Sequence, residues 1–254
     1  MSNRKMFLMG NWKMNHNIDE TVKFCEDAKE ASLVRIARSK GVTLGIAPSF
    51  ISLYSAKKHA HGLIVASQDC HYEDHGAYTS NISVPMLKDI GVDWSIIGHS
   101  EKRTYEGETS FVCARKLKTL VTNGMSAIYC VGETDKEYKA GITKDIIREQ
   151  IVTGLMNVTK EELLNIVIAY EPVWSIGTGL NASVEIAEDI CAYIRSLINE
   201  LFGKVASQKI QILYGGSVKP NNIHDYLQAE DVDGALVGGA SLKIESFKEL
   251  LMNI

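Results

Sequence analysis

The chain has 254 residues, of which 45% are hydrophobic and 23% are charged, and its formal net charge at pH 7 is −4. This length and composition are sufficient for a large hydrophobic core. The mixed charges leave no basic excess of the kind that binds nucleic acid or an anionic membrane, so an anionic ligand must be bound by local groups.

Short apolar runs alternate with longer helical patterns along the whole chain. Most of the runs are continuously apolar, as parallel strands buried on both faces should be. In chain order we predict strands at residues 6–10, 42–47, 63–68, 94–98, 126–132, 166–170, 210–216 and 234–239. Apolar residues recur at helical spacing at residues 109–123, 136–157, 184–202 and 244–251.

These elements form about eight strand–helix units of roughly 30 residues, without a proline- or serine-rich linker between them. Eight units in about 250 residues are typical of a closed (β/α)8 barrel, in which eight parallel strands are surrounded by an outer ring of helices. We predict this α/β fold as a single domain over residues 1–254. A doubly wound open sheet is the alternative, because periodicity does not show whether a sheet closes.

In such a barrel, the chemistry takes place where strands end and loops begin. The predicted strand ends carry the following polar side chains: Asn11, Lys13, Gln68, His99, Glu101, Glu133 and Glu171. Glu171 follows a buried strand and precedes Pro172, which disfavours a helix around it. We expect a pocket that excludes water to raise the pKa of Glu171 and make it a stronger base.

Glycine turns occur in three of the last loops, at residues 177–179, 215–217 and 238–239. Without side chains in the way, backbone N–H groups can point at an anion, and the start of a following helix adds a positive dipole. Phosphate sites of barrels lie after the seventh and eighth strands, where two of these turns are found. The sequence therefore predicts a phosphate group bound by backbone amides.

Two other motifs are weaker indications of a site. Residues 177–182, GTGLNA, fit a dinucleotide-binding pattern, but that pattern needs its glycine turn immediately after the strand, and residues 171–176 intervene. Cys70, His71 and His75 have no second cluster of matching spacing that would complete a metal site. We therefore expect no cofactor and no metal.

The cysteines indicate a reducing compartment. Five of them are widely spread without a Cys-x-x-Cys pair, which predicts neither a disulfide framework nor a structural zinc site. The apolar stretch near the N-terminus is too short for a signal peptide, and no stretch approaches the roughly 18 apolar residues of a membrane span. We expect a soluble cytoplasmic protein.

Six motifs together resemble the triosephosphate isomerase family, in order and at the expected spacing. They are GNWKMN (10–15), GHSEKR (98–103), YCVGE (129–133), AYEPVWSIGTG (169–179), LYGGSV (213–218) and LVGGASL (236–242). The resemblance implies a TIM barrel and an isomerase that interconverts dihydroxyacetone phosphate and D-glyceraldehyde 3-phosphate through an enediolate, in glycolysis and gluconeogenesis. Its partners would be small triose phosphates, and no cofactor or metal would be required.

The resemblance also implies catalytic roles. Glu171 would be the base that moves a proton between C1 and C2 of the substrate. His99, kept neutral, would donate to the carbonyl oxygens, and Lys13 would supply positive charge. Asn11 would donate a hydrogen bond near the reacting oxygens, and Glu101 would support Lys13.

A loop after Glu171 would close over the substrate. Residues 172–174 would be its stiff entry hinge and Ile176 its apolar tip, and closure would exclude water from the enediolate. Ser175, Leu180 and Asn181 depart from the usual family residues, which makes the exit hinge of this loop unusual for the family. The phosphate would be bound by the N–H groups of Gly177, Ser217, Gly238 and Gly239.

The family forms homodimers, which we expect here as well. Thr79 would reach Asn11 of the partner subunit. Family members pair a glutamate and an arginine across the interface, where this chain has Asn81 and Lys102. Because both halves of that ion pair are altered, we predict a dimer that dissociates on dilution more readily than usual.

Two other functions fit the same residues. A lyase would use Lys13 as a Schiff-base nucleophile, and borohydride would then trap a covalent substrate adduct on it. A non-catalytic barrel would bind sugar phosphates or a protein partner, and Glu171→Asp would leave that function intact.

Overall fold

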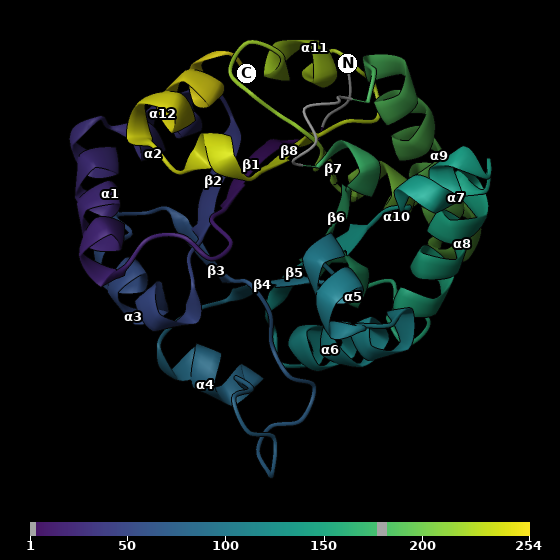
Figure 1. Ribbon diagram of the computed structural model, residues 1–254, viewed down its shortest axis with the longest axis horizontal. Helices are drawn as coiled ribbons and strands as arrows, with labels where there is room; N and C mark the ends of the chain where they lie inside the picture. Colours follow the sequence, from purple (N-terminus) through teal and green to yellow (C-terminus); the bar gives the residue numbers. More distant parts are fainter. Residues whose placement is uncertain (1–3, 177–181) are drawn as a thin grey trace.

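Eight parallel strands form a closed barrel in the computed structural model, which describes residues 4–176 and 182–254 (Figure 1). Each strand pairs with the next one along the chain, and β8 pairs with β1, which excludes the open sheet and confirms the predicted (β/α)8 barrel. The strands are β1 (Met6–Asn11), β2 (Val42–Ala47), β3 (Ile64–Ser67), β4 (Trp94–Ile97), β5 (Ser126–Val131), β6 (Ile166–Tyr170), β7 (Ile212–Tyr214) and β8 (Gly234–Val237).

Helices surround the strands in an outer ring (Figure 1). The α-helices are α1 (Ile18–Glu30), α2 (Leu33–Ser39), α3 (Phe50–His59), α4 (Val84–Asp89), α5 (Ser100–Glu106), α6 (Ser110–Thr122), α7 (Asp135–Lys139), α8 (Thr143–Gly154), α9 (Val184–Phe202), α10 (Lys204–Lys209), α11 (Ile223–Leu227) and α12 (Ile244–Met252). Short 3₁₀ turns are η1 (Glu162–Asn165), η2 (Val173–Ser175) and η3 (Gly239–Ser241). In the part of the chain that is described, no helix is long and apolar enough to cross a membrane.

The helix predicted over residues 136–157 is two helices, α7 and α8, and that prediction was wrong. A capping box between Thr134 and Glu137 begins α7, and the helix ends at Lys139, with Ala140 as its C-cap. Gly141 follows with a φ of 72°, a left-handed conformation that glycine adopts without a steric penalty and that commonly ends helices. The apolar spacing belongs to α8, so periodicity alone did not reveal the break.

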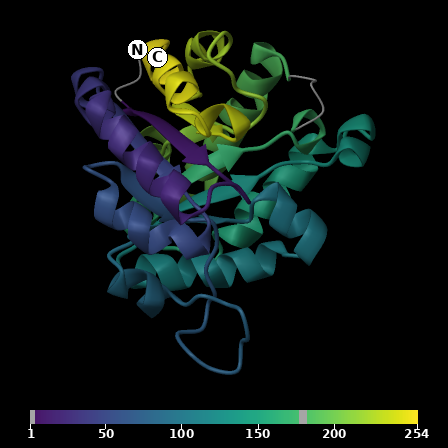
Figure 2. The same ribbon diagram turned by 60° about the vertical axis from the view of Figure 1, so that its left-hand side comes forward.

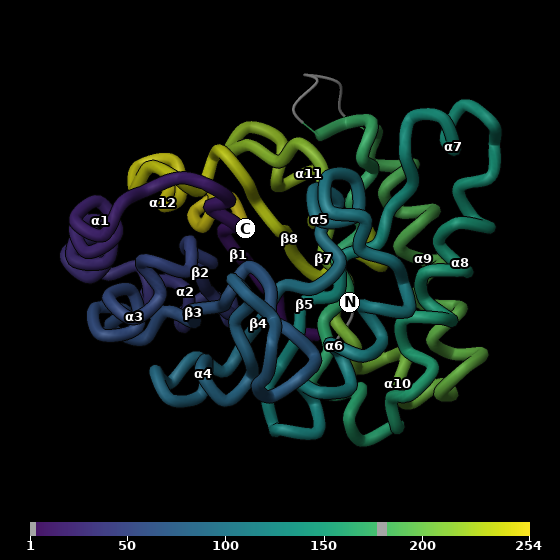
Figure 3. Tube along the Cα trace, turned by 60° about the horizontal axis from the view of Figure 1, so that its bottom comes forward, coloured from purple at the N-terminus to yellow at the C-terminus, as the bar shows by residue number. Residues whose placement is uncertain are grey.

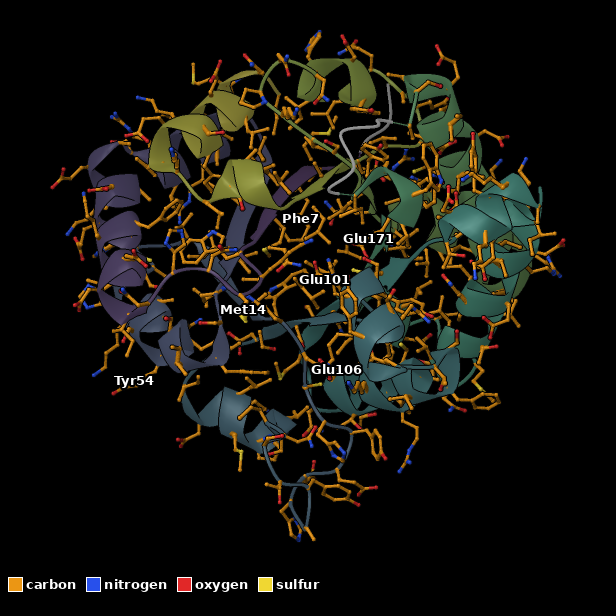
Figure 4. All side chains as sticks on the ribbon, viewed as in Figure 1. Phe7, Met14, Tyr54, Glu101, Glu106 and Glu171 are labelled. Carbon is orange, nitrogen blue, oxygen red and sulfur yellow. The ribbon has the colours of Figure 1, made fainter. Side chains whose placement is uncertain are left out.

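Side chains fill the barrel because successive residues of a strand point to opposite faces. Phe7 and Met9 point inward from β1, while Leu8 between them packs against the helices. Phe7 lies near the barrel axis in Figure 4 and meets Trp94 edge to face, with ring centroids 5.3 Å apart. The rest of the interior cluster consists of Ala47, Ala66, Ile96, Ile128, Cys130, Val167, Ala169, Leu213 and Leu236. The interior is therefore a packed core that supports the strand ends above it.

A buried ionic network lies at the amino-terminal ends of the strands. Arg195 of α9 donates through Nη2 to Asp233, at 2.8 Å, and through Nη1 to two backbone carbonyl oxygens. Arg195 also pairs with Asp231, and Arg4 donates through Nε to the other oxygen of Asp233. Asp233 accepts the N–H of Ile212 as well, which ties β7 to the start of β8.

One connection projects beyond the ring of helices. Figures 1 and 2 show the segment between β3 and α4, residues 68–83, extending away from the body of the barrel. Thr79 and Asn81 are both exposed on this segment. They lie far from the strand ends that carry the other predicted functional residues.

Candidate active site

A cavity of about 860 Å³ opens at the carboxyl ends of the strands. Residues that follow β1, β4, β6, β7 and β8 converge on it, and Figure 4 shows Glu171 near the barrel axis with Glu101 close by. The predicted site residues that line it are Asn11, Lys13, His99, Glu171, Ser217, Gly238 and Gly239. The fold thus collects, in one cavity, residues from nearly the whole length of the sequence, from Asn11 to Gly239.

Glu171 is held firmly at the end of β6. It is buried, and its N–H donates to the carbonyl oxygen of Val131 at 2.7 Å. A Cβ on Gly215 would lie 2.8 Å from Cγ of Glu171, and one on Gly132 would lie 1.8 Å from its carbonyl oxygen. Both neighbouring loops therefore need glycine, because any side chain there would displace the carboxylate or its backbone.

The carboxylate of Glu171 has two hydrogen-bond donors. Oε2 accepts the N–H of Ser100 at 3.0 Å, and Oε1 lies 3.0 Å from Nε2 of His99. Burial raises the pKa of Glu171, but the electrostatic interaction and hydrogen bond with His99 and the N–H of Ser100 outweigh burial, so the pKa is lowered. The expectation of a raised pKa was wrong for this arrangement, because the carboxylate faces donors and not an apolar wall.

His99 is the N-cap residue of α5, and its two ring nitrogens have different partners. Nδ1 accepts the N–H of Glu101 at 3.2 Å. Because a backbone N–H can only donate, this bond requires an unprotonated Nδ1, and the ring proton then lies on Nε2, facing Glu171. Burial lowers the pKa of His99, and the Glu171 carboxylate outweighs burial and raises it. The hydrogen bonds themselves match a neutral imidazole that donates into the cavity.

Lys13 is fixed at both its backbone and its amine. Its φ is 52°, its N–H donates to Oδ1 of Asn11 at 3.0 Å, and its carbonyl oxygen accepts from Gln68 at 2.7 Å. The Nζ atom pairs with Oε1 of Glu101 at 2.7 Å, and a Cβ on Gly238 would lie 3.7 Å from Cε of Lys13. The ammonium group is therefore positioned between Glu101 and the glycine turn after β8.

The turns after β7 and β8 present unused backbone donors. Among the described residues, none accepts a hydrogen bond from the N–H of Gly216, Ser217 or Gly239. The N–H and hydroxyl of Ser241 both donate to the carbonyl oxygen of Gly238, at 2.8 and 2.7 Å, which turns that carbonyl away and shapes η3. These amides can bind an anion, since charge-assisted bonds from N–H groups are strong.

The segment after Glu171 is tied down at its start. Trp174 donates through Nε1 to Oε1 of the fully buried Glu133 at 2.8 Å, and its ring stacks on Tyr138 with centroids 4.3 Å apart. Ser175 is buried and its hydroxyl donates to the carbonyl oxygen of Pro172. Ile176 lines the cavity. The contact predicted for Gly177 and the departures at Leu180 and Asn181 lie outside the described residues.

The three predicted dimer residues lie outside the cavity, and Glu101 does not line it either, although it pairs with Lys13. Thr79 and Asn81 are exposed on the projecting segment. Lys102 pairs within its own chain, 3.1 Å from Oδ2 of Asp69, and it also donates to Glu106. Lys102 is therefore not an unpartnered cation in this chain.

The sequence did not reveal two positioning groups. The N–H of Ser100 orients Glu171, and a backbone amide could come from any residue type, so no sequence signal marks it. Gln68 stands at a predicted strand end, but nothing in its surroundings showed that its Nε2 would bridge the carbonyl oxygens of Lys13 and Ala47.

Together these groups can perform one type of chemistry. A carboxylate and an imidazole N–H can remove a proton next to a carbonyl group and stabilise the oxyanion that develops. An ammonium group and backbone amides in the same cavity suit a substrate with an anionic tail. The site is therefore suited to enolisation of a small phosphorylated carbonyl compound.

Comparisons with known proteins agree with this chemistry. The family model described as triosephosphate isomerase matches residues 6–254. The chain is 44% identical over 250 residues to a triosephosphate isomerase of Carboxydothermus hydrogenoformans, with 98% of each chain covered. It is 42% identical to one of Clostridium perfringens, covering 98% of this chain and 99% of the relative, and 43% identical to one of Streptococcus gordonii, covering 98% of each. The chain belongs to the triosephosphate isomerase family, a family of isomerases.

Proposed function

We propose that this protein interconverts dihydroxyacetone phosphate and D-glyceraldehyde 3-phosphate by moving a proton between C1 and C2, in glycolysis and gluconeogenesis. The observation that carries this proposal is the pairing of Glu171 and His99, 3.0 Å apart, in a cavity that also contains unused backbone amides. Family membership supplies the substrate pair.

The phosphate group binds first in this proposal. The N–H groups of Ser217, Gly238 and Gly239 act on its oxygens, and Gly177 contributes from the loop after Glu171. Each aimed donor contributes about 1.5–3 kcal/mol, the usual range for hydrogen bonds to charged groups. Binding this remote anion fixes the carbon atoms between Glu171 and His99, which lowers the entropic cost of reaching the transition state.

Glu171 then acts as the base. In the free enzyme its carboxylate is satisfied by His99 and the N–H of Ser100, so it is ionised but a weakened base. A substrate carbonyl oxygen that takes over the Nε2–H of His99 removes one of these donors. The carboxylate becomes more basic and removes a proton from C1, and the carboxylic acid that forms later returns a proton to C2, while the hydroxyl proton on the C1 oxygen passes to the C2 oxygen through the imidazole of His99.

His99, Lys13 and Asn11 stabilise the enediolate. The Nε2–H of His99 donates to its oxygens, and Asn11 donates beside them. Lys13 adds positive charge and is itself oriented by Glu101 at 2.7 Å. Loss of one such aimed donor should cost on the order of 2.7–4 kcal/mol of transition-state stabilisation.

Closure of the loop after Glu171 protects the intermediate. The stacking and hydrogen bond of Trp174 support a stiff entry hinge, and Ile176 supplies an apolar surface at the cavity wall. Exclusion of water strengthens each electrostatic contact and disfavours expulsion of phosphate from the enediolate.

A coupled assay of glyceraldehyde 3-phosphate formation with Glu171→Gln tests the proposal. We expect kcat to fall by about 10²–10⁴-fold, the usual contribution of a positioned base, while 2-phosphoglycolate still binds. Glu249→Gln is the matched control, because Glu249 lines the same cavity from an exposed position. Unchanged turnover in Glu171→Gln would contradict the proposal, and a borohydride-trapped substrate adduct on Lys13 would favour the lyase instead.

The protein is further proposed to act as a cytoplasmic homodimer. The projecting segment and large exposed apolar side chains support an interface, with Met14 95% exposed and Tyr54 52% exposed. Figure 4 shows both of these side chains on the side of the ring from which the segment projects. All five cysteines are free and buried, which suits a reducing compartment.

A further inference from the structure

Glu26, His59 and His61 bring a carboxylate and two imidazoles together on the outer surface of the barrel. Glu26 lies on α1, His59 is the last residue of α3, and His61 follows in the connection to β3. Figures 1 and 3 show α1 and α3 side by side. The connection from α3 to β3 lies at the amino-terminal ends of the strands, so this cluster is at the opposite end of the barrel from Glu171.

Both imidazole rings contact the same carboxylate oxygen of Glu26. Oε1 of Glu26 lies 2.8 Å from Nδ1 of His59 and 2.9 Å from Nε2 of His61. All three atoms lie within 4.8 Å of one another. Within residues 4–176 and 182–254, no other three His, Cys, Asp or Glu side chains bring ligand atoms this close together.

The backbone around His61 directs its ring toward α1. His61 has a φ of 47° and Gly62 a φ of 98°, so the chain turns sharply between α3 and β3. The N–H of Leu63 donates to the carbonyl oxygen of Ala60 at 2.9 Å, and both of these residues are buried. The buried residues on either side therefore hold the turn in place, while the imidazole ring of His61 stays at the surface.

We propose that Glu26, His59 and His61 form a binding site for a divalent transition-metal ion, with Zn²⁺ as the best match. Zinc binds imidazole nitrogen and carboxylate oxygen at about 2.0–2.2 Å, and tetrahedral geometry then separates ligand atoms by roughly 3.2–3.5 Å. The carboxylate would therefore move back slightly from each ring. The side chains are 31–41% exposed, which leaves them free to do so. Water would fill the fourth position.

One nearby charge opposes the metal and gives the proposal a second test. Nζ of Lys29 lies 3.5 Å from Oε2 of Glu26, on the carboxylate oxygen that faces away from the histidines. The ion can bind Oε1 while Lys29 remains near Oε2, but the two positive charges repel each other. Removal of the Lys29 charge should therefore strengthen metal binding. If the cluster were only a structural set of side-chain contacts, the same change would remove the ion pair with Glu26 and lower the stability of the fold.

The bound ion would fasten α1 to the α3–β3 connection. An ion that binds only the folded chain stabilises it by mass action, so the effect appears as a rise in Tm. At about a hundred-fold excess over Kd, the stabilisation corresponds to a rise of roughly 5 °C or more for a chain of this size. The active site at the other end of the barrel should keep its turnover.

Calorimetric titration of the full-length, metal-free protein with Zn²⁺ tests the site, with 2-phosphoglycolate present to occupy the active site. We expect one ion per chain and a raised Tm, and Co²⁺ in place of Zn²⁺ should give the intense visible bands of a four- or five-coordinate ion. His59→Gln and His61→Gln should each weaken Zn²⁺ binding by at least about 10-fold, since even indirect partners of metal ligands cost 10–100-fold. Lys29→Met should strengthen it about 2–5-fold.

His224→Gln is the matched control, because His224 is an exposed histidine outside the cluster. Its Zn²⁺ affinity should equal that of the unaltered chain. The Tm of every variant without metal shows whether it is folded. Absence of Zn²⁺ binding, or binding that the His59 and His61 variants leave unchanged, overturns the proposal, and neither outcome affects the proposed isomerase activity.

Discussion

Nε2 of His99 lies 3.0 Å from Oε1 of Glu171, so the two side chains that converge on the cavity are bonded to each other. In the proposed mechanism, a substrate carbonyl oxygen replaces Glu171 as the acceptor of the Nε2–H of His99. The carboxylate is then ionised and held by His99 before the substrate binds, and it becomes free to act as the base once the carbonyl oxygen has taken its place.

This pairing predicts how the pKa of Glu171 responds to His99. Burial raises that pKa and His99 is the main group that lowers it, so His99→Gln should move the pKa upward. A lowered folded-state pKa contributes stability above the unfolded value of about 4.3, and that stability is lost as the pH falls through the folded value. The stability that Glu171 contributes to the unaltered chain should thus decrease as the pH falls below about 4.3. In His99→Gln this pH-dependent contribution should be smaller, because the pKa of Glu171 is lowered less. Carbon-13 NMR titration of labelled glutamate measures the shift, and an unchanged Glu171 pKa would contradict this assignment.

Gly215 should control the position of the Glu171 carboxylate. A Cβ in Gly215→Ala would lie 2.8 Å from Cγ of Glu171 and push the base out of line. Because a misplacement of about 1 Å can cost roughly 100-fold, we expect kcat to fall by about 10–100-fold. Steady-state kinetics measure this change, and circular dichroism with 2-phosphoglycolate binding shows that the fold and the phosphate site persist. Full activity in Gly215→Ala would contradict the prediction, because it would show that the loop shifts to accommodate the methyl group while Glu171 keeps its position.

Arg195 and Arg148 should differ sharply in their contribution to stability. Arg195→Met takes one of two cationic partners from Asp231 and Asp233 and leaves them only Arg4, which should cost about 3–5 kcal/mol in the free energy of unfolding. Arg148 pairs with Glu200 in the open, at 2.6 Å, so Arg148→Met should lower the free energy of unfolding far less than Arg195→Met does. Urea unfolding measures both values. Equal losses in the two variants would mean that the network at the amino-terminal strand ends is not a stabilising feature.

The cysteines should be inert in the folded chain. Burial raises the pKa of Cys25 and of Cys113 to about 12, and the thiolate is the reactive form. Labelling with Ellman's reagent at pH 8 should therefore be slow in native protein and rapid for all five thiols after unfolding in guanidinium. A thiol that reacts within seconds under native conditions would contradict the burial described for these side chains.

The proposed dimer should dissociate on dilution. Asn81 carries no charge, and Lys102 is already paired with Asp69 within its own chain at 3.1 Å, so an ion pair across the interface at these positions is not available. We expect sedimentation velocity to show monomer at nanomolar concentrations and dimer at micromolar ones. Asn81→Glu should shift the equilibrium toward dimer, and a dimer that persists unchanged at nanomolar concentration would argue against the prediction.

Much of the fold could be predicted from the sequence because its signals are local. Continuously apolar runs such as residues 166–170 favour strands buried on both faces, and eight of them with intervening helices leave few arrangements, but the closure of the sheet became visible only in the pairing of β8 with β1. The helix predicted over residues 136–157 failed where one left-handed residue, Gly141, separates the polar, unburied helix α7 from the amphipathic helix α8. Apolar spacing therefore indicated α8, and it did not show where the helix begins.

The sequence predicted most of the residues of the site, but it did not predict the direction in which the pKa of Glu171 is shifted. Strand-end position selected Asn11, Lys13, His99 and Glu171, which line the cavity, and also three residues that do not line it, namely Gln68, Glu101 and Glu133. The direction of the Glu171 pKa shift was not predictable, because it depends on the N–H of Ser100 at 3.0 Å, a group that every residue except proline carries. Such a distance is set by tertiary packing, so the identities of the residues do not predict it.

The buried network of Arg195 and Asp233 lies at one end of the barrel, and Glu171 lies at the other. Heat tolerance and turnover therefore depend on separate groups of residues. Substitutions beneath the strands can raise or lower the working temperature of this enzyme while its catalytic groups stay as they are.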